Sequence, residues 1–133
     1  MNDKATFRAW RTMVGFTQQD LAAKFKVPPK VAANWEREAA FDEIPDDVFD
    51  YVRRVKAIHG RMVAEKLAQF DEVEAGETVT LTYYRSQSQY EHAGGVGYYA
   101  LDNGVSLTVA GILEQDGVTV EWQYPPRRDV LPE

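Results

Sequence analysis

Residues 7–38 have the sequence FRAWRTMVGFTQQDLAAKFKVPPKVAANWERE, and their apolar spacing predicts three short helices. Phe7, Trp10 and Val14 are separated by three or four positions, the spacing of one helix face. Gly15 follows as the left-handed residue that ends many helices. We therefore expect the first helix to stop just before this glycine.

Capping residues predict the second and third helices. Thr17 precedes Asp20 by three positions, which forms a capping box completed by a carboxylate. Lys26 stands in the connecting turn, and Pro28 and Pro29 preset the entry into a third helix, whose first turn tolerates proline. Two short helices joined by a tight turn are typical of a helix-turn-helix, whose second helix can lie in the DNA major groove.

Over residues 5–38 the chain resembles the lambda-repressor-like family of regulators, also called xenobiotic-response-element-type helix-turn-helix proteins. The match is ungapped over some thirty positions. The residues that carry it are Phe7, Arg11, Gly15, Thr17, Gln18, Leu21, Ala22, Phe25, Val27 and the ending Trp35-Glu36-Arg37.

The resemblance implies a set of contacts with double-stranded DNA. Gln18, at the start of the second helix, would contact a phosphate or a base, and Arg37 would lie near the backbone. The third helix would present to the groove Pro29, Lys30, Ala33 and Asn34. Side-chain chemistry agrees, because Lys30 can donate to guanine O6 and N7 and Asn34 can pair bidentately with adenine.

Other basic residues are better suited to phosphates. Lys24, Lys26 and Arg11 would set the position on DNA without recognising sequence. The family usually has glycine where Lys26 stands, so we expect a strained or altered turn there. Pro28 and Pro29 occupy positions that usually carry polar residues, so specificity is expected to depend more on Lys30 and Asn34.

Charge is unevenly distributed along the chain. Residues 1–40 hold seven basic and four acidic side chains, a net of +3, whereas residues 41–133 hold eight and seventeen, a net of −9. This asymmetry favours one surface that meets an anion and another that does not. The alternative, that the basic residues simply lie on solvated helix faces, remains open on charge alone.

The rest of the chain predicts a long helix and a small α/β unit. Apolar residues from Val48 to Phe70 form one helical stripe over positions 46–70, and a second copy of the helix is one economical partner. Segment 101–113 fits either a helix capped by Asp102 or an alternating strand, and we favour the helix. The other expected elements are an acidic linker at 72–77, a strand at 78–84, a helix capped by Ser86 and ending near His92, a loop at 93–97 and a strand at 118–124.

A second, weaker resemblance covers residues 41–124 and is carried by the run IPDDVFDYVRR at 44–54, the long helix, the run LTYYRSQSQYE at 81–91 and a closing strand. On these features the chain resembles the helix-turn-helix regulators associated with anti-CRISPR operons and their bacterial relatives. In those proteins a small C-terminal α/β unit supports dimerisation. The predicted fold class is therefore α+β, mainly α. The expected division is a DNA-binding domain with its following helix at 1–74, a dimerisation unit at 75–124 and a mobile tail at 125–133.

Several function classes find little support in the composition. The chain has no cysteine, which excludes thiolate zinc sites and disulfides, and its two histidines lie far apart. We expect no metal, no cofactor and no catalytic site. No apolar run approaches the roughly 20 residues of a membrane helix, and the first residues lack a signal peptide, so we expect a cytoplasmic, nucleoid-associated protein without a membrane partner.

The tyrosine-rich second half allows more than one interpretation. Tyr83, Tyr84, Tyr98, Tyr99 and Trp122 could form a stacking platform for single-stranded nucleic acid. Their surroundings are acidic, so we favour a core or a dimer interface.

Together these patterns predict a homodimeric, sequence-specific transcriptional repressor that binds an inverted repeat, including one in its own operon. The first alternative is an antitoxin or protein-interaction module whose acidic C-terminal half binds a partner protein. The second is an enzyme that uses the tyrosine-rich cleft.

Overall fold

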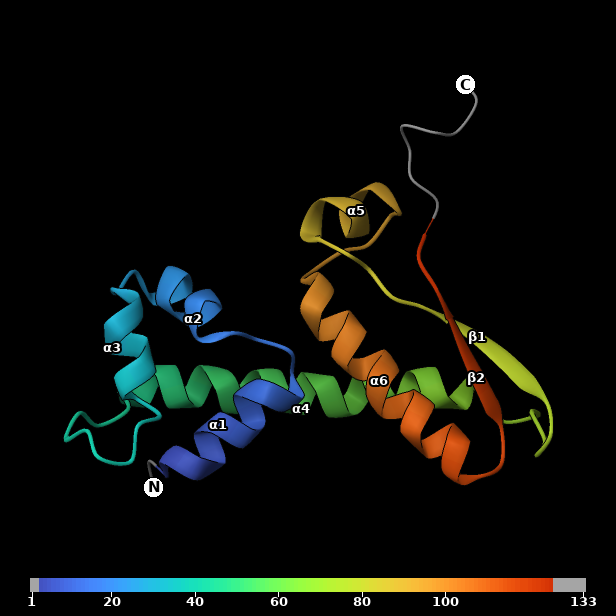
Figure 1. Cartoon of the computed structure of the whole chain (residues 1–133), viewed down its shortest axis with the longest axis horizontal. Coiled ribbons are helices and arrows are strands. Elements are labelled where there is room, and N and C mark those ends of the chain that lie inside the picture. The colour runs from blue at the N-terminus through green and yellow to red at the C-terminus, as the bar shows by residue number, and fades with distance from the viewer. Residues whose placement is uncertain (1–2, 126–133) are drawn as a thin grey trace. The chain divides into compact units, whose positions relative to one another are not determined.

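The computed structural model describes residues 3–125, which form six α-helices and two β-strands (Figure 1). The predicted class, α+β and mainly α, is confirmed. Apart from Pro125, the predicted tail lies outside the described residues. The elements are α1 (Lys4–Met13), α2 (Gln18–Phe25), α3 (Pro29–Asn34), α4 (Asp46–Ala68), β1 (Thr78–Thr82), α5 (Gln87–His92), α6 (Tyr99–Gln115) and β2 (Thr119–Gln123).

The chain divides into two compact units after His59, within α4. This differs from the predicted boundary at residue 74. The physical reason is that Met62, Val63 and Leu67, on the second part of α4, pack against the core that α6 and the strands form. The long helix thus contributes to both units rather than belonging to the first.

Unit 1 packs α1, α2, α3 and the first part of α4 around an aromatic centre. Phe7 is fully buried, with its ring 6.5 Å from that of Trp35 and 6.2 Å from that of Phe49. Burial of each such side chain stabilises the fold by about 1.5–3 kcal/mol. Further buried apolar residues of this unit are Val14, Phe16, Leu21, Ala22, Ala32, Ile44, Val48, Val52 and Val55.

The predicted caps of unit 1 are confirmed. Gly15 has φ 84°, as expected of the residue that follows a helix end. The Thr17 hydroxyl accepts from the Asp20 backbone N–H at 3.0 Å, and the Asp20 carboxylate accepts from the Thr17 N–H at 2.7 Å. This capping box fixes where α2 begins, and hence how it enters the turn toward α3.

Unit 2 is built on a two-stranded parallel sheet. Thr78 of β1 pairs with Thr119 of β2, and the register continues to Thr82 and Gln123. Parallel strands need a long crossover, which α5 and α6 supply. The core of the unit consists of Val79, Val105, Val109, Leu113 and Val118.

The favoured helical interpretation of 101–113 is confirmed by α6, but the predicted cap is wrong. The N-cap is Tyr98, whose side chain makes no capping hydrogen bond, and Asp102 lies in the first helical turn. Its carboxylate accepts instead from the Tyr90 hydroxyl at 3.2 Å. The Asp102 side chain thus joins α6 to α5, a tertiary contact that the local sequence did not reveal.

Candidate nucleic-acid interface

The connection between α2 and α3 is a tight turn built on an unusual backbone conformation. Lys26 has φ 55° and ψ 48°, which makes it the one non-glycine residue with positive φ among residues 3–125. The Val27 N–H donates to the Ala22 carbonyl at 3.0 Å, which closes the end of α2. The expected strain is therefore present: lysine adopts the left-handed conformation that glycine adopts at lower cost.

Helix α3 begins directly after this turn and is short. Pro28 is its N-cap and Pro29 its first residue, as the sequence predicts. The Pro28 carbonyl accepts from the Val31 N–H at 2.9 Å, so the first turn forms without a side-chain cap. Ala32 is 1 % exposed and anchors the inner face of the helix in unit 1.

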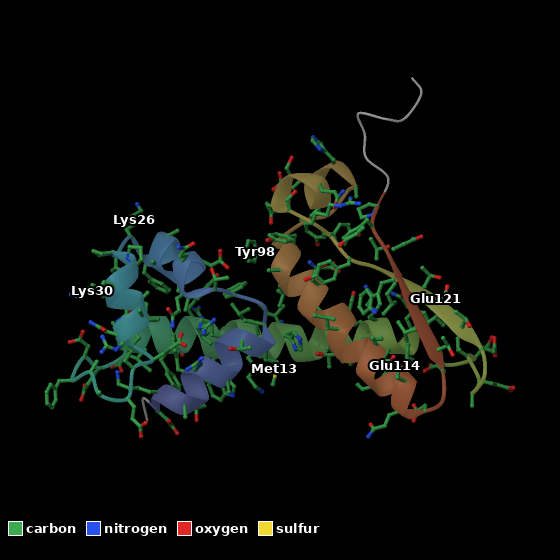
Figure 2. The ribbon with its side chains drawn as sticks, in the orientation of Figure 1. Met13, Lys26, Lys30, Tyr98, Glu114 and Glu121 are labelled. Carbon is green, nitrogen blue, oxygen red and sulfur yellow. The ribbon has the colours of Figure 1, made fainter. Side chains whose placement is uncertain are left out.

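The turn and α3 present an exposed basic surface. Lys26 and Lys30 both project outward from this part of unit 1 (Figure 2). Pro29 is exposed beside them, while Gln18 and Ala33 are half-buried. The exposed members of the sequence-predicted set on the turn and α3 are thus Lys26, Pro29 and Lys30, and we call this surface the basic face.

Lys24 is exposed but has an aromatic partner. Its ammonium lies 5.1 Å from the centre of the Tyr51 ring of α4. A cation–π contact of this kind is worth about 0.5–1 kcal/mol at an exposed site. Lys24 therefore helps hold α2 against α4, and its charge remains accessible at the surface.

Arg11 occupies a different environment from the one predicted. Its side chain is 12 % exposed and forms an ion pair with Glu36, whose side chain is 2 % exposed. Nη2 donates to Glu36 Oε1 at 2.8 Å, and Nη1 donates to the Phe16 carbonyl at 2.7 Å. The expectation of a phosphate contact is therefore corrected: Arg11 links α1 to the end of α3. Its place on the helical stripe of Phe7 was the signal for burial.

Sequence reasoning also missed Lys4. Its ammonium donates to the carbonyls of Asn34 at 2.8 Å, Trp35 at 3.2 Å and Asp42 at 2.6 Å. A cation is favourable at a helix C-terminus, where the last carbonyls lack partners. Lys4 therefore fixes the end of α3 and the loop that follows it, although nothing in the local sequence indicates this role.

At the end of α3, the side chain of Asn34, which the sequence predicts to contact a base, forms hydrogen bonds within the protein. Asn34 Nδ2 donates to Asp42 Oδ2 at 3.1 Å, and Asn34 Oδ1 accepts from Arg37 Nη1 at 3.2 Å. Asn34 is half-buried, whereas Arg37 and Asp42 are exposed. These three side chains form a continuous chain at the edge of the basic face.

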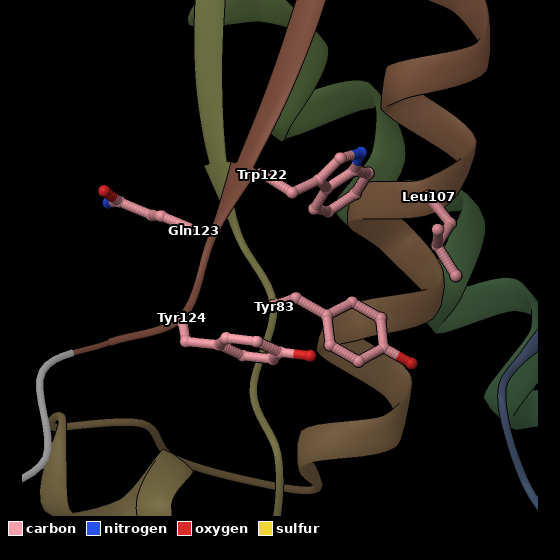
Figure 3. A pocket seen from close by; sticks show the side chains of 5 residues that line it. All are labelled: Tyr83, Leu107, Trp122, Gln123 and Tyr124. Atoms are coloured by element: carbon pink, nitrogen blue, oxygen red, sulfur yellow. The ribbon is translucent and has the colours of Figure 1, made fainter.

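Unit 2 carries a second surface of interest, an open aromatic groove. It has a volume of about 310 Å³ and is lined by Tyr83, Leu107, Trp122, Gln123 and Tyr124 (Figure 3). The Tyr83 ring lies 6.1 Å from that of Trp122 and 6.5 Å from that of Tyr124, with edge-to-face geometry in both pairs. Leu107 is 52 % and Tyr124 57 % exposed, which is unusual for large apolar side chains so close together.

The predicted aromatic set does not gather at one place. Tyr83 and Trp122 meet in the groove and are more than a third exposed, so neither belongs to the core. Tyr84 instead packs against the buried Tyr90, at 4.8 Å between ring centres. Tyr98 and Tyr99 form a separate pair at 5.4 Å.

A separate polar contact in unit 2 pairs a lysine with a serine, as some catalytic sites do, but the serine is closed to solvent. Lys66 Nζ donates to Ser106 Oγ at 2.8 Å and lies 3.8 Å from Asp102 Oδ1. Ser106 is 0 % exposed, so its hydroxyl is closed to a substrate. This contact therefore joins α4 to α6 within unit 2.

The described residues add two negative observations. Residues 3–125 contain no group of three or more histidine, aspartate or glutamate side chains placed to hold a metal ion. Within the same residues, no helix is both long enough and apolar enough to cross a membrane. Comparison with known proteins finds no family model that matches the chain and no matching relative among curated proteins.

Proposed function

We propose that the protein is a sequence-specific regulator of transcription that binds double-stranded DNA as a homodimer. The observation that carries this proposal is the basic face, displayed on a short helix behind a tight turn. A packed aromatic core holds that helix in place, and Lys26 and Lys30 extend into solvent. A helix mounted in this way has the dimensions that the major groove accepts.

The proposed contacts are of two kinds, one with bases and one with phosphates. Lys30, on α3, donates to guanine O6 and N7, which recognises sequence. Lys26 and Lys24 neutralise phosphates, which provides affinity without specificity. The negative remainder of the chain, with a net charge of −9 over residues 41–133, disfavours indiscriminate binding.

Dimerisation is assigned in this proposal to the aromatic groove. In a symmetric dimer the same surface of each copy faces its counterpart. Burial of Leu107, Trp122 and Tyr124 against a second copy would remove from water the most exposed apolar side chains of this face. On an inverted repeat, the recognition helices of the two copies would enter major grooves about 34 Å apart. Binding there would block polymerase, so the proposed activity is repression in the cytoplasm at the nucleoid, including of the protein's own operon, without catalysis.

Selection of bound sequences from a random duplex library, with the full chain, tests DNA binding and symmetry together. We expect enrichment of an inverted repeat. Binding of the selected duplex is then measured by fluorescence anisotropy at fixed salt. Lys30→Ala is expected to weaken it at least tenfold, because a good bidentate contact is worth about 1–3 kcal/mol and each dimer has two.

Lys56→Ala is the matched control. Lys56 lies on α4 with its ammonium 5.5 Å from the centre of the Trp10 ring, and the variant removes the same charge outside the basic face. We expect less than a threefold change in affinity. Absence of any enriched sequence, or equal effects of the two variants, would refute the proposal.

A second candidate, a protein-interaction module or antitoxin, is favoured by one observation: the aromatic groove lies in the acidic part of the chain. Analytical ultracentrifugation distinguishes this candidate from the homodimeric regulator. A wild-type dimer that Trp122→Ala converts to monomer supports the homodimer. A wild-type monomer that co-purifies in stoichiometric amount with one basic protein from its own operon supports the second candidate.

A further inference from the structure

We infer that Asp42 is a positioning residue for base recognition: it holds the Asn34 side-chain amide in the one orientation that pairs with adenine. This inference rests on the proposed function. It concerns three hydrogen-bonded side chains at the end of α3. The Asn34 amide lies between the Asp42 carboxylate on one side and the Arg37 guanidinium on the other.

Hydrogen-bond chemistry permits only one orientation of the amide. A carboxylate accepts hydrogen bonds and a guanidinium donates them. With Nδ2 toward Asp42 and Oδ1 toward Arg37, at 3.1 Å and 3.2 Å, both contacts are satisfied. A flipped amide would place its oxygen against the carboxylate and its N–H groups against the guanidinium, so both contacts would be lost.

The amide keeps enough capacity for a base. Its nitrogen has two N–H donors and its oxygen two lone pairs, and each protein contact uses one. One donor and one acceptor remain. Adenine presents N7 as an acceptor and the N6 amino group as a donor in the major groove, which is the complementary pair.

Tertiary structure holds the carboxylate in place. Lys4 donates to the backbone carbonyls of both Asn34 and Asp42, so one ammonium ties the loop to the end of α3. Two residues further on, Ile44 is 2 % exposed and anchors the loop in the core of unit 1. The orientation of Asn34 is therefore set before DNA binds, which lowers the ordering cost of recognition.

The position of Asp42 also has a cost that makes its role measurable. A negative charge beside the basic face repels phosphate, so its removal should increase affinity for any DNA. A residue that only bears charge would show that increase alone. A positioning residue would show it together with a loss of discrimination at one base pair.

The test uses the full chain, the selected duplex, and duplexes with each base pair changed in turn. Asn34→Ala first identifies the base pair that Asn34 recognises. At that pair we expect Asp42→Ala to lower discrimination about fivefold or more, given the worth of a bidentate contact, while affinity for a scrambled duplex rises. Asp42→Asn retains an oxygen that can accept from Asn34, so it should keep the discrimination.

Glu43→Ala is the matched charge control, because Glu43 is an exposed acid on the same loop. It should raise affinity for all duplexes and leave discrimination unchanged. In the double variant Asn34→Ala/Asp42→Ala, the second change should reduce discrimination no further. Lys4 contacts the Asp42 backbone rather than its carboxylate, so the loop should keep its place in these variants.

Two results would overturn the inference and leave the proposed function standing. One is a wild-type protein that selects a sequence while Asp42→Ala discriminates within twofold of it at every base pair. The other is an Asn34→Ala variant that loses no discrimination. A wild-type protein that selects no sequence would instead overturn the proposed function, and this inference with it.

Discussion

Replacement of Glu36 by alanine is expected to destabilise unit 1 by about 3–5 kcal/mol, the usual cost of leaving one member of a buried ion pair alone. The Glu36 side chain is 2 % exposed and that of Arg11 12 %, so water cannot replace the lost partner. The variant loses two charge-assisted hydrogen bonds, from Arg11 Nε and Nη2. Each is worth about 1.5–3 kcal/mol, which gives a similar total.

Arg8→Ala is a control on the same carboxylate. The Arg8 guanidinium lies 3.9 Å from Glu36, but its side chain is 70 % exposed. An exposed ion pair contributes at most about 1 kcal/mol. Comparison of Glu36→Ala with Arg8→Ala therefore separates the effect of a buried ion pair from that of an exposed one.

Urea unfolding followed by tryptophan fluorescence measures both variants, since Trp35 precedes Glu36 and is 3 % exposed. With a slope of about 2 kcal/mol/M, Glu36→Ala should lower the midpoint by about 2 M. The double variant Arg11→Met/Glu36→Leu should recover most of the loss, because apolar side chains can replace a buried ion pair. Equal midpoints for Glu36→Ala and Arg8→Ala would refute this reasoning.

Four further predictions concern Thr17 and Lys26 in unit 1 and Gly95 and the Tyr90 phenol in unit 2. Thr17→Ala removes the α2 cap and should cost about 1 kcal/mol in urea unfolding, whereas an unchanged midpoint would contradict the role of the capping box. Lys26→Gly should remove the steric strain of the left-handed conformation and raise the free energy of unfolding by about 1 kcal/mol, while DNA affinity falls. A lower free energy of unfolding would contradict this expectation. Gly95→Ala should destabilise unit 2, seen by Trp122 fluorescence, because its Cβ would lie 2.4 Å from the Tyr90 ring. Burial, with the nearby negative charge of Asp102, raises the pKa of Tyr90 to about 12. The neutral phenol therefore contributes stability that is full below about pH 10 and is lost as the pH rises toward 12. Tyr90→Phe should lack this part of the pH dependence, and parallel curves for the two proteins from pH 9 to pH 12 would contradict it.

The features that the sequence determined alone are those formed by neighbours along the chain. Gly15, the capping box at Thr17 and the two prolines at the start of α3 each act over a few residues, so their local pattern sufficed to place the first three helices. The long apolar stripe likewise predicted α4. These interactions do not depend on the rest of the fold.

Other features depend on contacts between residues that are distant in sequence, and the tertiary structure sets these contacts. The parallel pairing of β1 with β2 joins segments about 40 residues apart, and no local pattern encodes its direction. The sequence predicts a phosphate contact for Arg11, whereas in the fold its guanidinium pairs with Glu36, 25 residues further along the chain. The orientation of Asn34 likewise depends on Asp42, which Lys4 holds from α1. Sequence periodicity shows which face of a helix is apolar, but the partner of a polar side chain is set only when distant segments pack together.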